Sequence, residues 1–409
     1  MRKSGVQLTL FYFLVVALMG VLMRSMALFS VPGFAYSNVL HAHSHVAILG
    51  WAYMALFLLI YKLFIPQQRI GSSSKQLQVL YGLTQLAVVG MLVSFILQGY
   101  ALFSIAFSTM HIVLSYWFVS DVWRKLREPQ LSVTILKGSL LCLVVSSIGP
   151  WMLAILSANA LTGSSWYDAA IYFYLHFQYN GWLALGLIAV FLRLLERKAV
   201  AYPDRLAKWQ WWLYAGSLLP TFLQAMLWLD IGPFLTVIAA LATITNWLSI
   251  TLLCVIGYRL REPLSRLFHG WASRFFVLAC MALFLKSAMS LGTLVPDLAD
   301  MIYTTRPVII GYLHLILLGF ISFALLALYL QQGWLSGNIG ITRLGFALLV
   351  FGFIMNELIL FLQGLWEWLR IEPFSYAYEG LWLTSLVMAL GILLFQTAIS
   401  KKSKDDVML

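Results

Sequence analysis

Twelve apolar stretches dominate the sequence, and each is close to or above the roughly 20 residues that a helix needs to cross a bilayer. Backbone polar groups find no water in the hydrocarbon core, so runs of this length predict membrane-spanning helices. The 409 residues are 62% hydrophobic and 10% charged, whereas a soluble domain carries roughly 25% charged residues. We therefore predict an all-α membrane protein with twelve transmembrane helices, near 6–29, 39–63, 76–99, 101–123, 133–158, 168–194, 208–229, 233–258, 272–294, 305–331, 342–366 and 380–400.

The basic residues are distributed unevenly between the connections. If the N-terminus is cytoplasmic, 22 of the 26 lysines and arginines lie on the cytoplasmic side, as the positive-inside rule expects. We therefore predict that both termini are cytoplasmic, in a bacterial-type inner membrane. With this distribution, the net charge of +11 indicates a bilayer surface and not a nucleic acid as the partner. The sequence predicts a single transmembrane domain over 1–400 and a short charged cytoplasmic tail over 401–409.

A histidine motif occurs three times, in the form His-x4-Gly-(Trp/Phe). Its histidines are 131 and 138 residues apart and fall on the second, sixth and tenth predicted helices. Similarity at a fixed period indicates repeated structural units, here roughly 1–125, 130–260 and 270–400. The three copies are His45 with Gly50 and Trp51, His176 with Gly181 and Trp182, and His314 with Gly319 and Phe320.

Four histidines from four helices share one level of the predicted bundle. His45, His111, His176 and His314 lie about 10–15 Å below the outer boundary at 1.5 Å per residue. Neutral imidazole is an axial ligand of haem iron, and two imidazoles give a low-spin centre suited to electron transfer. The glycine of each motif would let a porphyrin approach the helix. Close helix packing is the alternative role of these glycines.

The segment from His43 to Trp51 resembles the tenth-helix haem segment of the C-type oxidases, although here it lies on the second helix. The run that starts at His45 is also similar to the second helix of nitric oxide reductases, and Gly311–His314 is similar to their tenth-helix ligand. The chain thus resembles subunit I of the haem–copper oxidase and nitric oxide reductase superfamily. The resemblance implies three four-helix arcs in pseudo-threefold symmetry. It also implies a low-spin haem b on His45 and His314, with His43 as the alternative to His45.

The chain departs from this family at the reactive centre. Tyr312 stands where the family has the histidine that binds the high-spin haem, and the predicted helix 208–229 has no histidine. The usual binuclear centre therefore lacks two ligand positions, so we do not expect copper at the usual site. His43, His111 and His176 are candidates for a second haem or metal site. No catalytic residue is assigned.

Several charged residues lie within or beside the predicted spans. Lys286 and Glu357 are at similar depth and would form an ion pair or part of a proton path, because charges facing lipid are costly. Lys286 and Arg370 are also candidates for binding haem propionates, since arginine pairs well with carboxylates. Interfacial snorkelling is the alternative for Arg370.

The sequence leaves three functions open. The first is an oxidoreductase similar to oxidases or nitric oxide reductases. Its electron donor would be a quinol or a separate protein, since no Cys-x-x-Cys-His haem attachment motif is present; the resemblance also implies additional membrane subunits. The second is a non-enzymatic haem protein for nitric oxide stress or sensing. The third is a proton-coupled transporter without haem, using Lys286 and Glu357.

Overall fold

The computed structural model describes residues 2–66, 68, 74–229, 231–295, 298–299, 302, 304–337, 340–372 and 375–396, so the predicted tail 401–409 lies outside the described residues. Within these ranges, eleven helices are long and apolar enough to cross a membrane. The prediction of an all-α membrane protein is confirmed. The eleven spans are Ser4–Leu28, Tyr36–Phe64, Lys75–Gln98, Leu102–Lys125, Leu131–Ala158, Ser165–Arg197, Pro233–Arg259, Trp271–Leu294, Arg306–Gln331, Gly340–Leu369 and Ala377–Phe395.

The predicted span 208–229 is not one continuous α-helix. It consists of α11 (Asp204–Leu218) followed by the 3₁₀-helix η3 (Pro220–Leu229). Proline has no backbone N–H to continue the α-helical ladder, and the Phe222 N–H donates to the Leu219 carbonyl three residues back, at 3.1 Å. The count of twelve spans therefore stays a prediction.

Each of the three repeated motifs lies where an α-helix changes into a π-helix. In every copy the histidine is the last α-helical residue, and the glycine and the aromatic residue fall within the π segment. In a π-helix each backbone hydrogen bond spans five residues and not four, and such segments are frequent at functional sites. The transitions are α2 (Tyr36–His45) to η1 (Val46–Ala52) to α3 (Tyr53–Phe64), α9 (Ser165–His176) to η2 (Phe177–Ala184) to α10 (Leu185–Arg197), and α16 (Arg306–His314) to η5 (Leu315–Ser322) to α17 (Phe323–Gln331).

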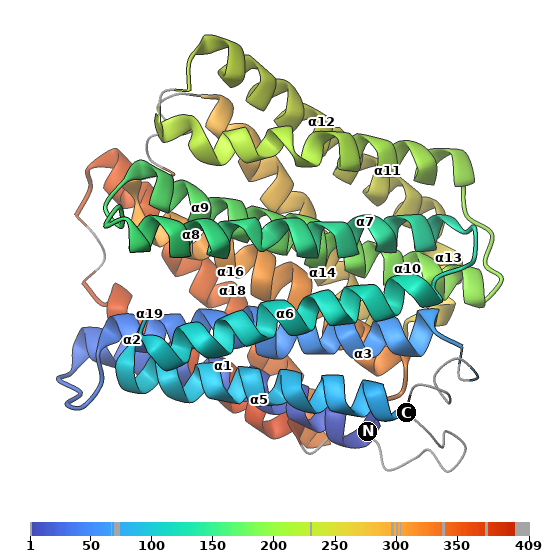
Figure 1. Ribbon diagram of the computed structural model, residues 1–409, viewed down its shortest axis with the longest axis horizontal. Helices are drawn as coiled ribbons and strands as arrows, with labels where there is room; N and C mark the ends of the chain where they lie inside the picture. The colour runs from blue at the N-terminus through green and yellow to red at the C-terminus, as the bar shows by residue number, and fades with distance from the viewer. Residues whose placement is uncertain are drawn as a thin grey trace. The chain divides into compact units, whose positions relative to one another are not determined.

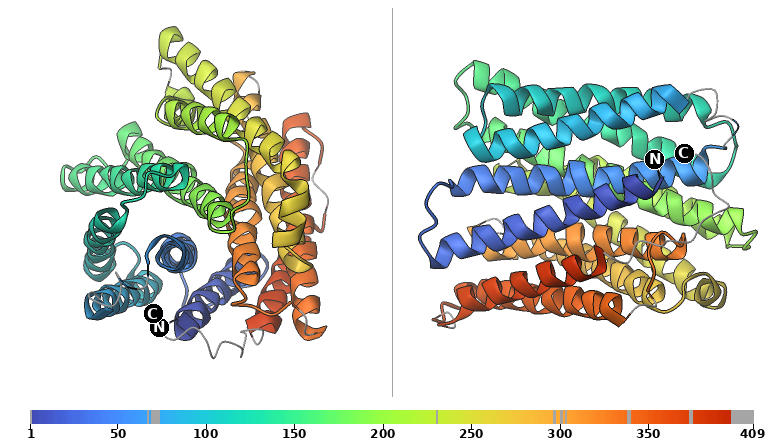
Figure 2. Two further views of the ribbon diagram at one scale, coloured as in Figure 1. Left: turned by 90° about the vertical axis from the view of Figure 1, so that its right-hand side faces the viewer. Right: turned by 90° about the horizontal axis from the view of Figure 1, so that it is seen from below.

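The helices form two compact units. Unit 1 consists of Met1–Lys125, His269–Phe275 and Ser322–Leu409, and unit 2 of Leu126–Phe268 and Phe276–Ile321. Long helices run alongside one another within each unit, as α5 and α6 do in unit 1 (Figures 1 and 2). Besides the helices already named, the long elements are α1 (Arg2–Leu28), α5 (Ser74–Gln98), α6 (Leu102–Lys125), α7 (Leu131–Ser146), α8 (Ile148–Ala158), α12 (Pro233–Arg259), α14 (Trp271–Ser290), α18 (Gly340–Leu369) and α19 (Ala377–Phe395); the short ones are α13 (Arg261–Leu267) and the 3₁₀-helix η4 (Leu291–Leu294).

The π-helix η1 lies in the core of unit 1. Trp51 is 2% exposed; its indole N–H donates to Ser322 Oγ at 2.9 Å, and its ring stacks on Phe13 at 4.6 Å between centroids. A buried indole of this kind is a large apolar group whose one polar atom is satisfied. The motif's aromatic residue thus fixes η1 against α1 and positions the histidine that precedes it.

Candidate functional site

The two neighbouring α2 histidines point to different sides of the helix. His43 lies against α1, with Nδ1 at 3.0 Å from the Val16 carbonyl oxygen. His45 lies against the α5 end, with its ring 4.4 Å from that of Phe95. Residues two apart on a helix face different ways, which explains the separation. The two histidines therefore belong to different surroundings within unit 1.

The hydrogen bonds of these histidines define which ring nitrogen carries the proton. His45 Nδ1 is 2.9 Å from the His41 carbonyl oxygen, and His43 Nδ1 has the Val16 carbonyl described above. A carbonyl only accepts, so Nδ1 carries the proton and Nε2 has the lone pair. Histidines that ligate metals are typically held in this way, by an N–H donated to a backbone carbonyl or carboxylate. Both α2 histidines thus have the tautomer required for an Nε2 ligand.

His111 on α6 joins His45 in the same part of unit 1. It is 2% exposed, and its ring lies near the backbone of Leu49, four residues after His45. Its Nε2 has no hydrogen-bond partner. The ring of Tyr53 lies 4.9 Å away, and His41 lies beside Tyr100 at 4.5 Å. The structure therefore groups His41, His45 and His111 and leaves His43 on the opposite side.

His176 in unit 2 has both ring nitrogens engaged by protein groups. Nε2 is 2.8 Å from the Leu218 carbonyl and must donate to it. Nδ1 is therefore the acceptor, and it receives the amide N–H of Asn180 at 3.2 Å. The Leu218 carbonyl lies at the end of α11, where the change to the 3₁₀-helix leaves it available to accept this hydrogen bond from His176. In this arrangement His176 offers no lone pair to a metal, so its predicted role as a ligand would require a rearrangement of these bonds.

Lys286 extends this chain of hydrogen bonds. The lysine is 6% exposed and donates from Nζ to Asn180 Oδ1 at 2.9 Å. It also lies over the ring of Tyr312, 5.6 Å from the centroid. Glu357 belongs to unit 1, where it accepts from Asn356 Nδ2 at 3.0 Å. Since Lys286 and Glu357 belong to different units, their ion pair stays a prediction.

In two of the π-helices, a side chain from another helix lies near the backbone of the residue four positions after the histidine. In η1 this residue is Leu49, whose backbone lies near the His111 ring. In η2 it is Asn180, whose carbonyl accepts from the Tyr214 hydroxyl at 2.9 Å. The irregular ladder of a π-helix explains why side chains from other helices can approach these backbone positions. Asn180 and Tyr214 are thus site residues that the sequence analysis missed, and their only sequence signal is their position within or opposite the repeated motif.

The glycines of the first two motifs lie against neighbouring helices. A Cβ at Gly50 would lie 3.0 Å from Val88 Cγ1, and one at Gly181 would lie 2.6 Å from Cys142 Cβ. Both positions show the packing role, the alternative that the sequence left open. Gly319 is buried within η5.

The remaining predicted ligands lie at helix ends. His314 is the half-buried last residue of α16. Arg370 is exposed and follows α18 with a φ of 55°, a left-handed conformation that usually ends a helix with glycine. The exposure fits an interfacial position, and the proposed contact of Arg370 with a propionate stays a prediction.

Metal-binding potential is limited to small sets of ligands. Among the residues that the structure describes, no three His, Cys, Asp or Glu side chains are placed to share an ion. One or two imidazoles are nevertheless sufficient for haem iron, because the porphyrin supplies the other four ligands. The donor set is therefore compatible with haem and not with a four-ligand structural zinc site.

Comparison with known proteins identifies the architecture. The structure is similar to that of a haem–copper terminal oxidase, seen as a dimer by cryo-electron microscopy, with a TM-score of 0.70 over 97% of this chain and 83% of that chain. The chain has the fold of a haem–copper oxidase. Sequence identity over this match is 11%. No protein-family model matches the sequence, and no curated protein matches it significantly.

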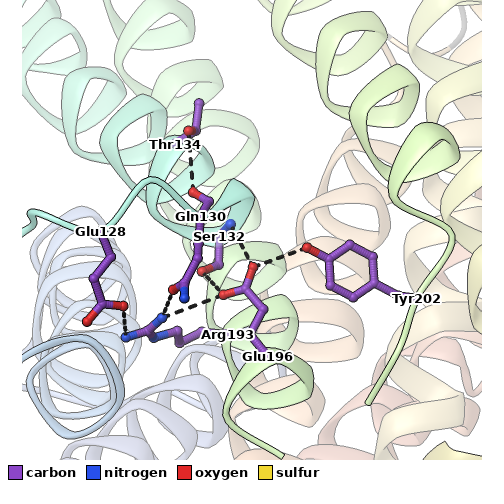
Figure 3. Close-up of polar contacts among 7 residues, drawn as sticks. All are labelled: Glu128, Gln130, Ser132, Thr134, Arg193, Glu196 and Tyr202. Carbon is purple, nitrogen blue, oxygen red and sulfur yellow. Dashed lines mark hydrogen bonds and ion pairs between the residues drawn. The ribbon is translucent and has the colours of Figure 1, made fainter. Parts of the chain in front are cut away.

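The oxidase fold here includes a polar cluster at the end of α10, shown in Figure 3. Arg193, 5% exposed, pairs with Glu128 at 2.7 Å and with Glu196 at 3.6 Å, and donates to the Gln130 side chain. Glu196 also accepts from the backbone N–H and hydroxyl of Ser132. The cluster ties the segment before α7 to α10.

Tyr202 completes this cluster from the following loop and is expected to titrate late. Its hydroxyl donates to Glu196 Oε1 at 3.2 Å, and burial, followed by the charge of Glu196, raises the pKa of Tyr202 from 10.0 to about 12. A raised phenol pKa favours the protonated form, so this stabilisation is complete below pH 10 and is lost as the pH rises through about 12. Phenolate absorbance of wild type minus Tyr202→Phe measures this titration. Glu196→Gln should lower the pKa, and an unchanged value would contradict the role of Glu196.

Proposed function

We propose that this chain is an integral membrane haem protein of the oxidase type. The proposal rests on the two α2 imidazoles, His43 and His45. Each donates its Nδ1 proton to a backbone carbonyl, which leaves the ring lone pair on Nε2. This arrangement prepares an axial ligand, and it occurs in a chain with the fold of a haem–copper oxidase. Haem b would supply a one-electron carrier inside the membrane.

The residues of this chain supply the ligand, the orientation and the apolar surroundings. His45 or His43 provides the imidazole from α2, and its hydrogen bond fixes the ring plane. His314 ends the third motif, and its role as an axial ligand stays a prediction. We further propose a quinol or a separate electron-transfer protein as the electron donor, and additional membrane subunits as partners. Conversion of oxygen or nitric oxide would need an open coordination position on a haem.

The visible spectrum tests this proposal. We expect the purified protein to show reduced-minus-oxidised bands of a low-spin b-type haem. His314→Ala should abolish them, whereas His176→Ala should retain them because the His176 nitrogens are bound within the protein. A protein that stays colourless after expression with ample haem precursor would exclude the proposal.

Carbon monoxide then separates the functions. A carbon monoxide-shifted spectrum would indicate an open iron position and reactive chemistry. An unchanged spectrum would favour electron transfer or a non-enzymatic role in nitric oxide stress. A colourless but folded protein would favour the proton-coupled transporter, for which the buried Lys286 in unit 2 is the specific supporting observation.

A further inference from the structure

Three buried side chains of unit 2 form a continuous chain of hydrogen bonds. Lys286 on α14 donates from Nζ to Asn180 Oδ1 at 2.9 Å, and Asn180 Nδ2 donates to His176 Nδ1 at 3.2 Å. His176 Nε2 in turn donates to the Leu218 carbonyl at 2.8 Å. All three side chains are buried. Each of these bonds is therefore made inside the protein, and His176 is not one of the proposed haem ligands.

The amide of Asn180 links the protonation states of its two neighbours. Its oxygen only accepts hydrogen bonds, and its nitrogen only donates them. In the orientation described, the nitrogen faces His176 Nδ1, which must carry a lone pair, and the oxygen faces Lys286, which donates. A proton on His176 Nδ1 therefore requires the amide to turn end for end. The amide nitrogen would then donate to Lys286, which can accept only after losing a proton.

Two positive charges do not fit this chain of hydrogen bonds. If His176 and Lys286 were both protonated, both would donate toward an amide that has a single oxygen. One buried N–H would then face the amide nitrogen, and a buried donor without an acceptor is costly. The two charges would also repel each other in apolar surroundings, where water screens them little. The chain therefore holds at most one charge.

The neighbouring helices do not compensate a second charge. In the part of the chain that the structure describes, no carboxylate forms an ion pair with Lys286. Phenols and thiols are uncharged below about pH 8, and the face of a phenol ring attracts an ammonium group. The titratable groups that face the chain from other helices are Tyr214 on α11, Tyr312 on α16 and Cys142 on α7.

We propose that His176, Asn180 and Lys286 form a site for a single proton, which occupies either Lys286 Nζ or His176 Nδ1. Exchange between the two states breaks one N–H bond on Lys286, forms one on His176 and turns the amide of Asn180 end for end. The total charge of the chain is unchanged. The site thus moves a positive charge between α14 and α9, as a proton relay inside a membrane does. It does not depend on the proposed haem.

Nitrogen NMR of the full-length protein in detergent counts this proton. Histidine and lysine side chains are isotope-labelled, and their signals are assigned through the backbone. At about pH 5, where an unperturbed histidine and an unperturbed lysine are both charged, we expect the protonated fractions of His176 and Lys286 to sum to one. Two charged residues at this pH, or none, would overturn the proposal. The measurement is the same whether or not the protein contains haem.

Two substitutions of Lys286 distinguish competition for the proton from burial alone. Lys286→Arg keeps a group that always donates, so the amide stays in place and His176 should remain neutral at about pH 5. Lys286→Met removes the competing amine, so the amide can turn and the His176 Nδ1 signal should shift from the acceptor type to the N–H type. His176 in the same charge state in both variants would contradict the proposal.

His269 provides the matched control. It is an exposed loop histidine and should take up its proton at the same pH in the wild type and in both variants. Circular dichroism confirms that each variant is folded. Where a variant fails to fold, the sum of the two fractions in the wild type still decides the question.

Discussion

Replacing Asn180 by leucine is expected to lower the free energy of unfolding by about 2–4 kcal/mol, since each buried polar group left without its partner costs about 1–3 kcal/mol. The amide of Asn180 links two groups: its oxygen accepts from Lys286 Nζ, and its N–H donates to His176 Nδ1. Leucine can replace neither bond. Unfolding in mixed detergent micelles, followed by circular dichroism, measures the change.

A double-mutant cycle distinguishes the chain of hydrogen bonds from a loss of packing. Lys286→Met removes the amino group that Asn180→Leu would leave in the apolar interior. The double variant should therefore be less destabilised than the sum of the two single variants, by about 1–2 kcal/mol, as expected for directly coupled groups. Effects that simply add would show that Lys286 and Asn180 are not coupled.

Gln178 offers a control in the same π-helix. Its amide donates to Ser146 Oγ at 3.0 Å, and its own oxygen has no partner. Ser146 retains its bond to the Leu143 carbonyl in Gln178→Leu. Removing one neutral hydrogen bond should cost only about 1 kcal/mol. A loss equal to that of Asn180→Leu would indicate a general sensitivity of η2 to substitution.

The sequence predicted the membrane spans well because their signal is summed over many residues. The mean hydropathy of a run such as Tyr36–Phe64 is averaged over many residues, so one polar residue does not change the prediction. The exception is 208–229, which has enough apolar residues but contains Pro220, and the backbone there becomes a 3₁₀-helix. Hydropathy measures side chains and not the hydrogen-bond ladder. The division of this span could therefore not be read from composition.

The candidate site was predictable in part. The three motif copies marked the correct places along the chain, and each proved to be an α-to-π transition. The grouping of the histidines was less accessible. A π segment changes the residue count per turn, so helical spacing alone does not tell which ring reaches a neighbouring helix. The approach of His111 to Leu49, and the use of Asn180 by Lys286, depend on contacts between helices far apart in sequence.

Replacing Arg193 by leucine is expected to destabilise the protein by about 2–4 kcal/mol, because removal of one partner from a buried ionic cluster leaves the others uncompensated. Arg193 contacts Glu128, Gln130 and Glu196 at once (Figure 3). Arg193→Lys should recover only part of the loss, since a lysine cannot reproduce the planar fork of the guanidinium. Detergent unfolding measures both variants.

The ion pair of Lys208 with Asp204 is the matched control for Arg193. Its two side chains are 57% and 56% exposed, whereas those of Arg193 and Glu196 are 6% and 10% exposed. An exposed pair contributes roughly 0–1 kcal/mol, so Lys208→Leu should have little effect. Adding Glu196→Gln to Arg193→Leu removes the carboxylate that the first substitution leaves uncompensated, and should restore part of the stability. If the double variant is no more stable than Arg193→Leu, the loss comes from packing around the arginine and not from its charge.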